Sequence, residues 1–141
     1  MSADAPDRSV EQPAATAGAG FPRSARLLKH SDFERVYKQG RRHFSSHMTV
    51  FYLRLAGAPS TEQRERVGFT VGRVLGGAVE RNRIKRRLRE AVRLRRAVLK
   101  GAVDVVINPK KSVLTLEFSA VLEEVGRAFD VIAKKLAEKQ K

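Results

Sequence analysis

The sequence has no cysteine. It therefore offers no disulfide framework, no thiolate metal ligand and no cysteine nucleophile, and the fold must depend on packing alone. No apolar run approaches the roughly 18 residues of a membrane-spanning helix. The N-terminus carries acids and prolines where a secretory signal has a basic start and then an apolar stretch. These absences predict a cytoplasmic protein that does not span a membrane.

Acidic residues are scarce relative to basic ones. Lys and Arg number 29 against 15 Asp and Glu, which gives a formal net charge of +14. Such an excess disfavours a compact state through self-repulsion unless a polyanion neutralises it. Nucleic acid is the leading candidate for that partner, and an anionic membrane surface is the second.

The first 22 residues have the composition of a disordered tail. They are rich in Ala, Gly, Pro and Ser, contain no spaced apolar residues, and carry three acids against one arginine. A segment of this kind cannot bury enough apolar surface to offset the entropy of ordering. We predict a disordered extension over residues 1–22 and a single domain over residues 23–141, a length that supports a core without staples.

Turn residues and apolar spacing predict an α+β fold in which helices pack on a small sheet. Residues 31–34 have the form of a capping box, and Gly40 suits the end of the helix that follows. Apolar residues alternate with small ones over residues 66–72, which is typical of a strand. The expected helices are residues 32–39, a segment of about twenty residues that begins after Gly76-Gly77, and a segment from Thr115 or Glu117 to the C-terminal end. The second helix carries an apolar stripe of Ile84, Leu88, Ala91, Val92 and Leu99, and the third one of Val121, Leu122, Val125, Phe129, Ile132 and Leu136. The expected strands cover residues 48–55, 66–72 and 103–107.

The segment from Arg81 to Lys100 is strongly basic, with ten basic residues and one acid, Glu90. Like charges three or four residues apart on a helix repel each other by roughly a few tenths of a kcal/mol per pair. Helix faces that serve only solubility usually interleave both signs, so the scarcity of acids favours nucleic-acid binding over a solvated face. Arginine outnumbers lysine here, and its planar guanidinium can hold phosphate oxygens in pairs or stack on a base.

Several uncharged residues could contribute to such a site, and each has a plainer explanation. Asn82 could contact a nucleotide or serve as the N-cap of the basic helix. Gly76-Gly77 could let backbone amides approach a phosphate, or could form an ordinary turn. Phe33, Tyr37 and Tyr52 could stack on unpaired bases or could belong to the core.

The residues that usually carry catalysis form no recognisable pattern in this sequence. The three histidines, His30, His43 and His47, have no regular ligand spacing. No nucleophile motif and no carboxylate cluster stands out among the Ser, Asp and Glu residues. The sequence therefore predicts no catalytic residue and no firmly bound metal in the protein itself.

The stretch from Arg66 to Arg89, RVGFTVGRVLGGAVERNRIKRRLR, resembles the signature region of the bacterial ribonuclease P protein component. A strand, a glycine turn and the sequence Arg81-Asn82-Arg83 follow one another in the order and spacing of that family. The similarity extends less strictly from about Leu27 to Leu136 and leaves residues 1–22 outside it. One departure is Val74, which follows Arg73 where the family often has two consecutive lysines.

The resemblance implies an α/β sandwich with about three helices, a four-stranded sheet and a left-handed crossover that carries the arginine-rich helix. It also implies a ribonucleoprotein that removes the 5′ leader of precursor tRNA. In it a catalytic RNA uses Mg²⁺, and the protein, monomeric by itself, binds both RNAs. The residues implied to contact the catalytic RNA are Arg73, Arg81, Asn82, Arg83, Lys85, Arg86 and Arg89, and those implied to line a cleft for the leader are Phe33, Tyr37, Tyr52 and Thr70.

Three rival functions fit parts of the same sequence. A ribosomal or other structural RNA-binding protein could share a basic α+β domain. A helix-turn-helix DNA binder is disfavoured because no pair of short helices with a tight turn precedes the basic one. A protein nuclease is disfavoured because the sequence shows no carboxylate cluster.

Overall fold

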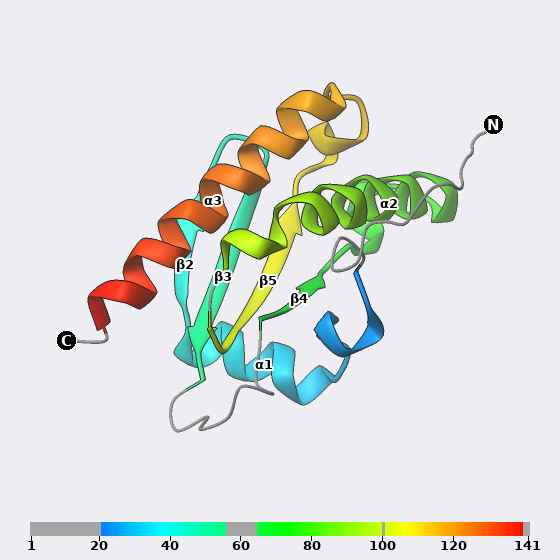
Figure 1. Ribbon diagram of the computed structural model, residues 1–141. Helices are drawn as coiled ribbons and strands as arrows, with labels where there is room; N and C mark the ends of the chain where they lie inside the picture. The colour runs from blue at the N-terminus through cyan, green and yellow to red at the C-terminus, as the bar shows by residue number, and fades with distance from the viewer. Residues whose placement is uncertain (1–20, 56–64, 100, 140–141) are drawn as a thin grey trace.

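The computed structural model describes residues 21–55, 65–99 and 101–139. In it a four-stranded sheet, in the order β2-β3-β5-β4, lies between α1 on one face and α2 with α3 on the other (Figure 1). The predicted α+β sandwich is therefore confirmed. The strands are β2 (Arg41–Phe44), β3 (Met48–Arg54), β4 (Arg66–Phe69) and β5 (Val103–Pro109), and the helices are α1 (His30–Gln39), α2 (Ala78–Arg95) and α3 (Phe118–Lys139).

Strand pairing is antiparallel except between β4 and β5, which are parallel neighbours joined through α2. In Figure 1 both strands run upward, β5 lies to the left of β4, and α2 lies in front of them, so the crossover is left-handed. Crossovers between parallel strands are right-handed in about 98% of cases. The chain therefore has the unusual handedness that the family resemblance implies.

β2 is the strand that the sequence patterns did not predict. Its residues 41–44 are Arg-Arg-His-Phe, and all but His43 are exposed. β2 forms one edge of the sheet and pairs with β3 alone. Because a solvated edge strand buries little apolar surface, it lacks the alternation by which strands are recognised in a sequence.

The start of α1 differs from the predicted capping box at residues 31–34. The helix begins at His30, and its N-cap, Lys29, makes no side-chain capping bond. Glu34 does not reach back to Ser31, because its carboxylate lies 3.2 Å from Nε2 of His30. Gly40 does end the helix, as predicted, and a Cβ at that position would lie 2.5 and 2.6 Å from two backbone carbonyl oxygens.

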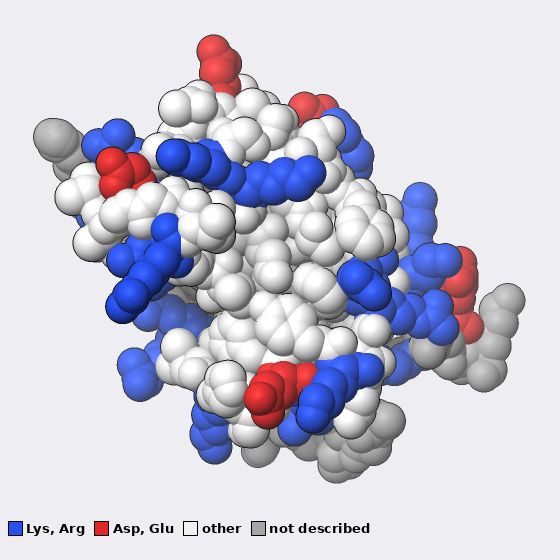
Figure 2. Space-filling model, turned by 180° about the vertical axis from the view of Figure 1, so that it is seen from behind, with Lys and Arg blue, Asp and Glu red and all other residues white. Residues whose placement is uncertain are grey.

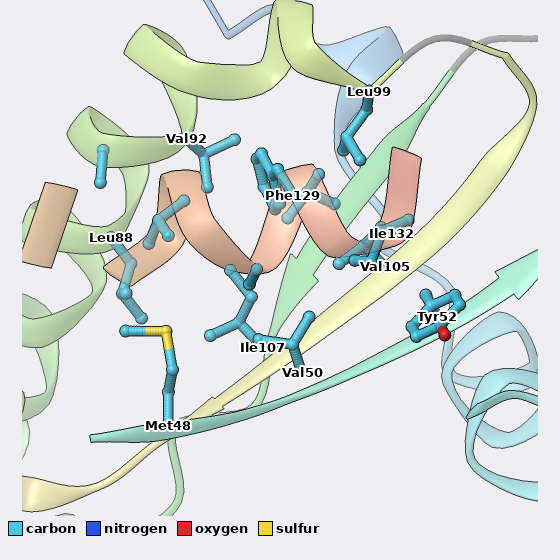
Figure 3. Close-up of a cluster of buried hydrophobic side chains, with 14 of the residues drawn as sticks. Met48, Val50, Tyr52, Leu88, Val92, Leu99, Val105, Ile107, Phe129 and Ile132 are labelled. Carbon is cyan, nitrogen blue, oxygen red and sulfur yellow. The ribbon is translucent and has the colours of Figure 1, made fainter. Parts of the chain in front are cut away.

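The main core lies between the sheet and the α2–α3 pair (Figure 3). Alternate residues of β3, β4 and β5 point into it, as the pleat of a strand requires. The apolar stripes predicted for the two long helices are confirmed, except that Leu122 is only partly buried and that Leu99, although buried, lies beyond the end of α2. The core side chains drawn in Figure 3 include Met48, Val50, Tyr52, Leu88, Val92, Leu99, Val105, Ile107, Phe129 and Ile132.

The boundary of the folded region lies earlier than the sequence suggested. Phe21, which we placed in the tail, is only 9% exposed and packs in the main core, with its ring 6.2 Å from that of Phe69. A single aromatic residue among small ones gives no periodic signal, so its packing could not be anticipated. Pro22 is exposed, and residues 1–20 of the predicted tail lie outside the described residues.

Asp104 is fully buried in β5, on the side of the sheet that faces α1. Its carboxylate oxygens accept hydrogen bonds from Nε and Nη2 of Arg66 at 2.9 and 2.8 Å. On α1, Asp32 accepts a hydrogen bond from Arg35 at 2.6 Å and lies 3.5 Å from Nη1 of Arg66. The bond to Asp104 raises the pKa of Arg66, although burial acts in the opposite direction. These four residues, here called the ionic network, join α1 to the sheet.

We expect Asp104→Asn to lower the free energy of unfolding by about 3 kcal/mol, because the partly buried guanidinium of Arg66 loses its carboxylate partner. Urea denaturation followed by circular dichroism measures this loss. Adding Arg66→Gln should cost less than its effect in the unmodified protein, since the two residues share one interaction. An Asp104→Asn variant as stable as the exposed control Asp130→Asn would contradict the role of the network.

Candidate nucleic-acid interface

α2 presents an apolar side to the core and a basic side to solvent. Ile84, Leu88, Ala91 and Val92 are completely buried against the sheet and α3. Their spacing of three and four residues leaves the rest of the helix surface to charged side chains. Among the residues predicted to bind RNA, Lys85 and Arg81 are partly buried, and those that lie exposed are Arg73, Asn82, Arg83, Arg86 and Arg89.

The start of α2 is fixed by the glycine pair. Gly76 has a φ of +130°, a backbone conformation that residues other than glycine rarely adopt. Its carbonyl oxygen accepts a hydrogen bond from Nε of Arg81 at 3.2 Å. Gly77 is the N-cap, and its amide donates to the Glu80 carboxylate at 3.1 Å. The Gly77 amide therefore already has a hydrogen-bond partner within the chain and is not free to contact a phosphate. Asn82 lies inside the helix and is exposed, so the alternative that it serves as the N-cap is excluded.

Like charges crowd one another along α2. Burial lowers the pKa of Arg89, and the nearby guanidinium groups of Arg26 and Arg86 lower it further. Burial also lowers the pKa of Arg87, with Arg83 adding to the effect. A neighbouring polyanion would relieve this repulsion, which is the physical reason to expect RNA on this side of the helix.

Some of the arginines in the basic segment serve the fold instead. Arg87 turns inward, and its Nη2 donates to the backbone carbonyl of Leu116. Arg96 forms a largely buried ion pair with Glu65 at 2.9 Å. The sequence alone could not separate these structural arginines from the exposed ones, because their partners, Leu116 before α3 and Glu65 before β4, are far from them along the chain.

On the other face of the sheet, the structure brings three of the four predicted cleft residues together. The Tyr37 hydroxyl lies 2.5 Å from Oγ1 of Thr70 and donates to Oδ1 of Asn108 at 3.0 Å. Phe33 lies directly over Gly68, where an added Cβ would come within 2.5 Å of its Cζ atom. Gly68 thus makes room for the Phe33 ring beside the sheet.

Tyr52 does not belong to this group, and its predicted place in the cleft is wrong. It is 6% exposed and points into the main core on the opposite face of the sheet (Figure 3). Burial raises the pKa of its phenol, with a smaller opposing effect of Arg41. Strand alternation gives the reason: Tyr52 shares the parity of the buried Met48 and Val50, so the residue before it faces α1.

Phe51 occupies the position that we had given to Tyr52. Its ring packs edge-on against Tyr37, with centroids 4.8 Å apart and planes at 88°. It is grouped with Phe33 and Leu53 on the α1 side of the sheet and is only partly buried. Figure 2, seen from behind, shows an uncharged surface in the middle of the molecule with Lys and Arg around it. We call the following residues the aromatic face: Phe33, Tyr37, Phe51, Thr70 and Asn108.

An open hollow of about 270 Å³ lies between this face and α2. Phe33 belongs to its wall, together with Phe69 of β4. Lys85 and Arg89 of α2 line the same hollow, so cationic and aromatic side chains meet there. The two candidate RNA-contacting surfaces are therefore adjacent.

A family profile for ribonuclease P matches residues 21–133. The chain belongs to the ribonuclease P protein family. The ribonuclease P protein component of Desulforapulum autotrophicum is 37% identical over 114 residues, which cover 81% of this chain and 93% of that one. That of Dictyoglomus turgidum is 37% identical over 105 residues, covering 73% of this chain and 84% of the relative.

Solved structures of ribonuclease P proteins share the fold. The protein from Thermotoga maritima superposes with a TM-score of 0.64 at 26% identity, covering 74% of this chain and 94% of that one. The protein from Staphylococcus aureus gives a TM-score of 0.65 at 23% identity, with 77% and 94% covered. The family resemblance read from residues 66–89 is thus confirmed.

Within the ranges that the structure describes, no helix is long and apolar enough to cross a membrane. In the same ranges, no group of three or more His, Asp or Glu side chains is arranged to hold a metal ion. The described surface that stands out is therefore the pairing of a basic helix with an uncharged aromatic face.

We expect Arg83→Ala to weaken binding of a ribonuclease P RNA, because Arg83 is exposed on the basic side of α2. Losing one phosphate contact should also reduce the slope of log K against log salt by about 0.7 to 0.9. Filter binding across a salt series measures both quantities. Arg127→Ala is the matched control, since Arg127 is 68% exposed on α3 and carries the same charge. Equal affinities and slopes for the two variants would remove Arg83 from the interface.

Proposed function

We propose that this protein is the subunit of ribonuclease P that holds the substrate against the catalytic RNA. The exposed side of α2 binds the catalytic RNA. The aromatic face, which we call the leader-binding face from here on, takes the single-stranded 5′ leader of precursor tRNA. The protein acts as a monomer in the cytoplasm, and its role is to aid endonucleolytic removal of the leader. The observation that carries this proposal is the placement of Tyr37, Phe51 and Thr70 on one uncharged face beside the cationic helix.

The leader-binding face suits an unpaired strand better than a duplex. Single-stranded RNA is recognised by aromatic rings that stack on splayed bases and by polar groups that reach base edges. Phe33, Tyr37 and Phe51 supply rings, while Thr70 and Asn108 supply a hydroxyl and an amide. Stacking contributes about 1 to 3 kcal/mol per base, so one or two stacked leader nucleotides tighten substrate binding about tenfold or more.

The catalytic RNA and the protein have different roles in this proposal. We expect the catalytic RNA, with Mg²⁺, to carry out hydrolysis, and the protein to contribute no reacting group. The basic side of α2 neutralises RNA phosphates, which brings a polyanionic substrate and a polyanionic catalyst together. The leader contacts add affinity that applies to the precursor and not to the mature tRNA, and so favour release of the product.

We expect Tyr37→Ala to weaken binding of precursor tRNA to the reconstituted holoenzyme by about fivefold or more, the lower end of one stacked base. Affinity for mature tRNA, which lacks a leader, should not change. Tyr37→Phe keeps the ring but loses the hydroxyl bonds to Thr70 and Asn108. Its affinity for precursor tRNA should therefore lie between the affinities of the unmodified protein and of Tyr37→Ala. Equal losses for precursor and mature tRNA would argue against a leader-binding role.

A further inference from the structure

An exposed aromatic side chain lies at the edge of the sheet, beyond the leader-binding face. Phe44, the last residue of β2, is 69% exposed, and it is the one aromatic among the large apolar side chains that the structure describes as exposed. The guanidinium carbon of Arg42 lies 5.8 Å from the ring centre of Phe44 and 5.8 Å from that of Phe51. A free ring beside a guanidinium offers two planar groups on which a base can stack.

Packing does not account for this aromatic residue. Phe44 belongs to neither of the two hydrophobic clusters among the described residues. An exposed phenylalanine on an edge strand also adds a risk of association between sheet edges. A ring that adds nothing to the core and lies beside a binding face is better explained by a ligand.

Strand register places Phe44 in line with the polar groups of the leader-binding face. Phe44 pairs with Thr49 of β3, and Thr49 pairs with Asn108 of β5. Thr70, which directly follows β4, comes next to Asn108 in the same row because the β4–β5 pairing continues by one residue. Residues paired across neighbouring strands share a face of the sheet. The row Thr70, Asn108, Thr49 and Phe44 therefore crosses the whole sheet on the side of α1.

The length of this row fits a short piece of single-stranded RNA. Neighbouring strands lie about 4.8 Å apart, so three intervals from β4 to β2 span about 14 Å. Nucleotides in a fully stacked strand advance about 3.4 Å each, so the row accommodates up to about four of them. A leader that contacts Tyr37 at the β4 end and follows the row reaches Phe44 where the sheet ends.

We propose that Arg42 and Phe44 form a second stacking site for the leader, about three or four nucleotides beyond the one at Tyr37. This inference rests on the proposed function, because it extends the leader-binding face across β2. Its ligand is an unpaired base of the same RNA strand, with the Arg42 guanidinium stacked on the base or bound to the adjoining phosphate. The second site makes substrate affinity depend on leader length.

A series of precursor tRNAs whose leaders grow one nucleotide at a time tests this site. With the reconstituted holoenzyme, affinity should rise once when the leader reaches Tyr37, and again about three or four nucleotides later. Phe44→Ala should abolish the second rise, a loss of about fivefold or more for long leaders, and leave the first rise intact. Phe44→Tyr, which keeps a ring, should retain both rises.

Abasic nucleotides separate stacking from charge. An abasic leader position at the second site should lower affinity as much as Phe44→Ala does, and combining the two should give no further loss. Arg127→Ala, which removes an exposed charge from α3, should leave both rises unchanged. Arg42→Ala should reduce the second rise alone.

The outcomes distinguish this inference from the proposed function. If the second rise is missing, or if it survives Phe44→Ala, the site at Arg42 and Phe44 is wrong while leader binding at Tyr37 stands. If the first rise is also missing, or if Tyr37→Ala leaves it unchanged, the leader-binding role itself is wrong. Phe44 is too exposed for its truncation to leave a cavity, so we expect Phe44→Ala to fold normally, with an unchanged melting temperature.

Discussion

The attachment of α1 to the sheet through the buried carboxylate of Asp104 is the constraint on which the rest of the account depends. Asp104 is held by Arg66 from β4, and Arg66 in turn reaches Asp32 on α1. Removing the partner of a buried charge is strongly destabilising, so both Asp104 and Arg66 must be present for α1 to be held in this position. Because α1 carries Phe33 and Tyr37, the same bonds that hold the helix determine where two aromatic groups of the leader-binding face lie.

The two faces of the sheet have different roles, one in the core and one in contact with a ligand. One face packs on α2 and α3 and contains the main core, so residues there are committed to stability. The other face is only partly covered by α1, which leaves Phe51, Thr70 and Asn108 available for contact with a ligand. The left-handed crossover brings α2 from β4 back over the core side, so that Lys85 and Arg89 meet Phe33 at the shared hollow.

Sequence patterns predicted the parts of this arrangement that depend on one element at a time. The spacing of Ile84, Leu88 and Val92 identified the buried side of α2, and the scarcity of acids identified its basic side. The resemblance of residues 66–89 to the ribonuclease P family supplied the fourth strand and the crossover, which local periodicity could not. The roles assigned to the exposed arginines and to Tyr37 remain predictions until they are measured.

Features that depend on contacts between elements were missed or misassigned. β2 lacks an apolar alternation, and its pairing depends on β3. Tyr52 was assigned to the cleft from the family resemblance, but in the structure it shares the strand parity of the buried Met48 and Val50 and lies in the core. Glu34 pairs with His30 instead of completing a capping box, a choice between two local bonds that spacing alone does not decide.

The most direct test of the central claim is cleavage of precursor tRNA by a bacterial ribonuclease P RNA at low magnesium, with and without this protein. The 5′ end of the product is mapped at nucleotide resolution. The account predicts cleavage at the mature 5′ end that requires both the RNA and the protein. Tight RNA binding without any stimulation of cleavage would contradict it, and would identify the chain as a structural RNA-binding protein that shares the family's fold.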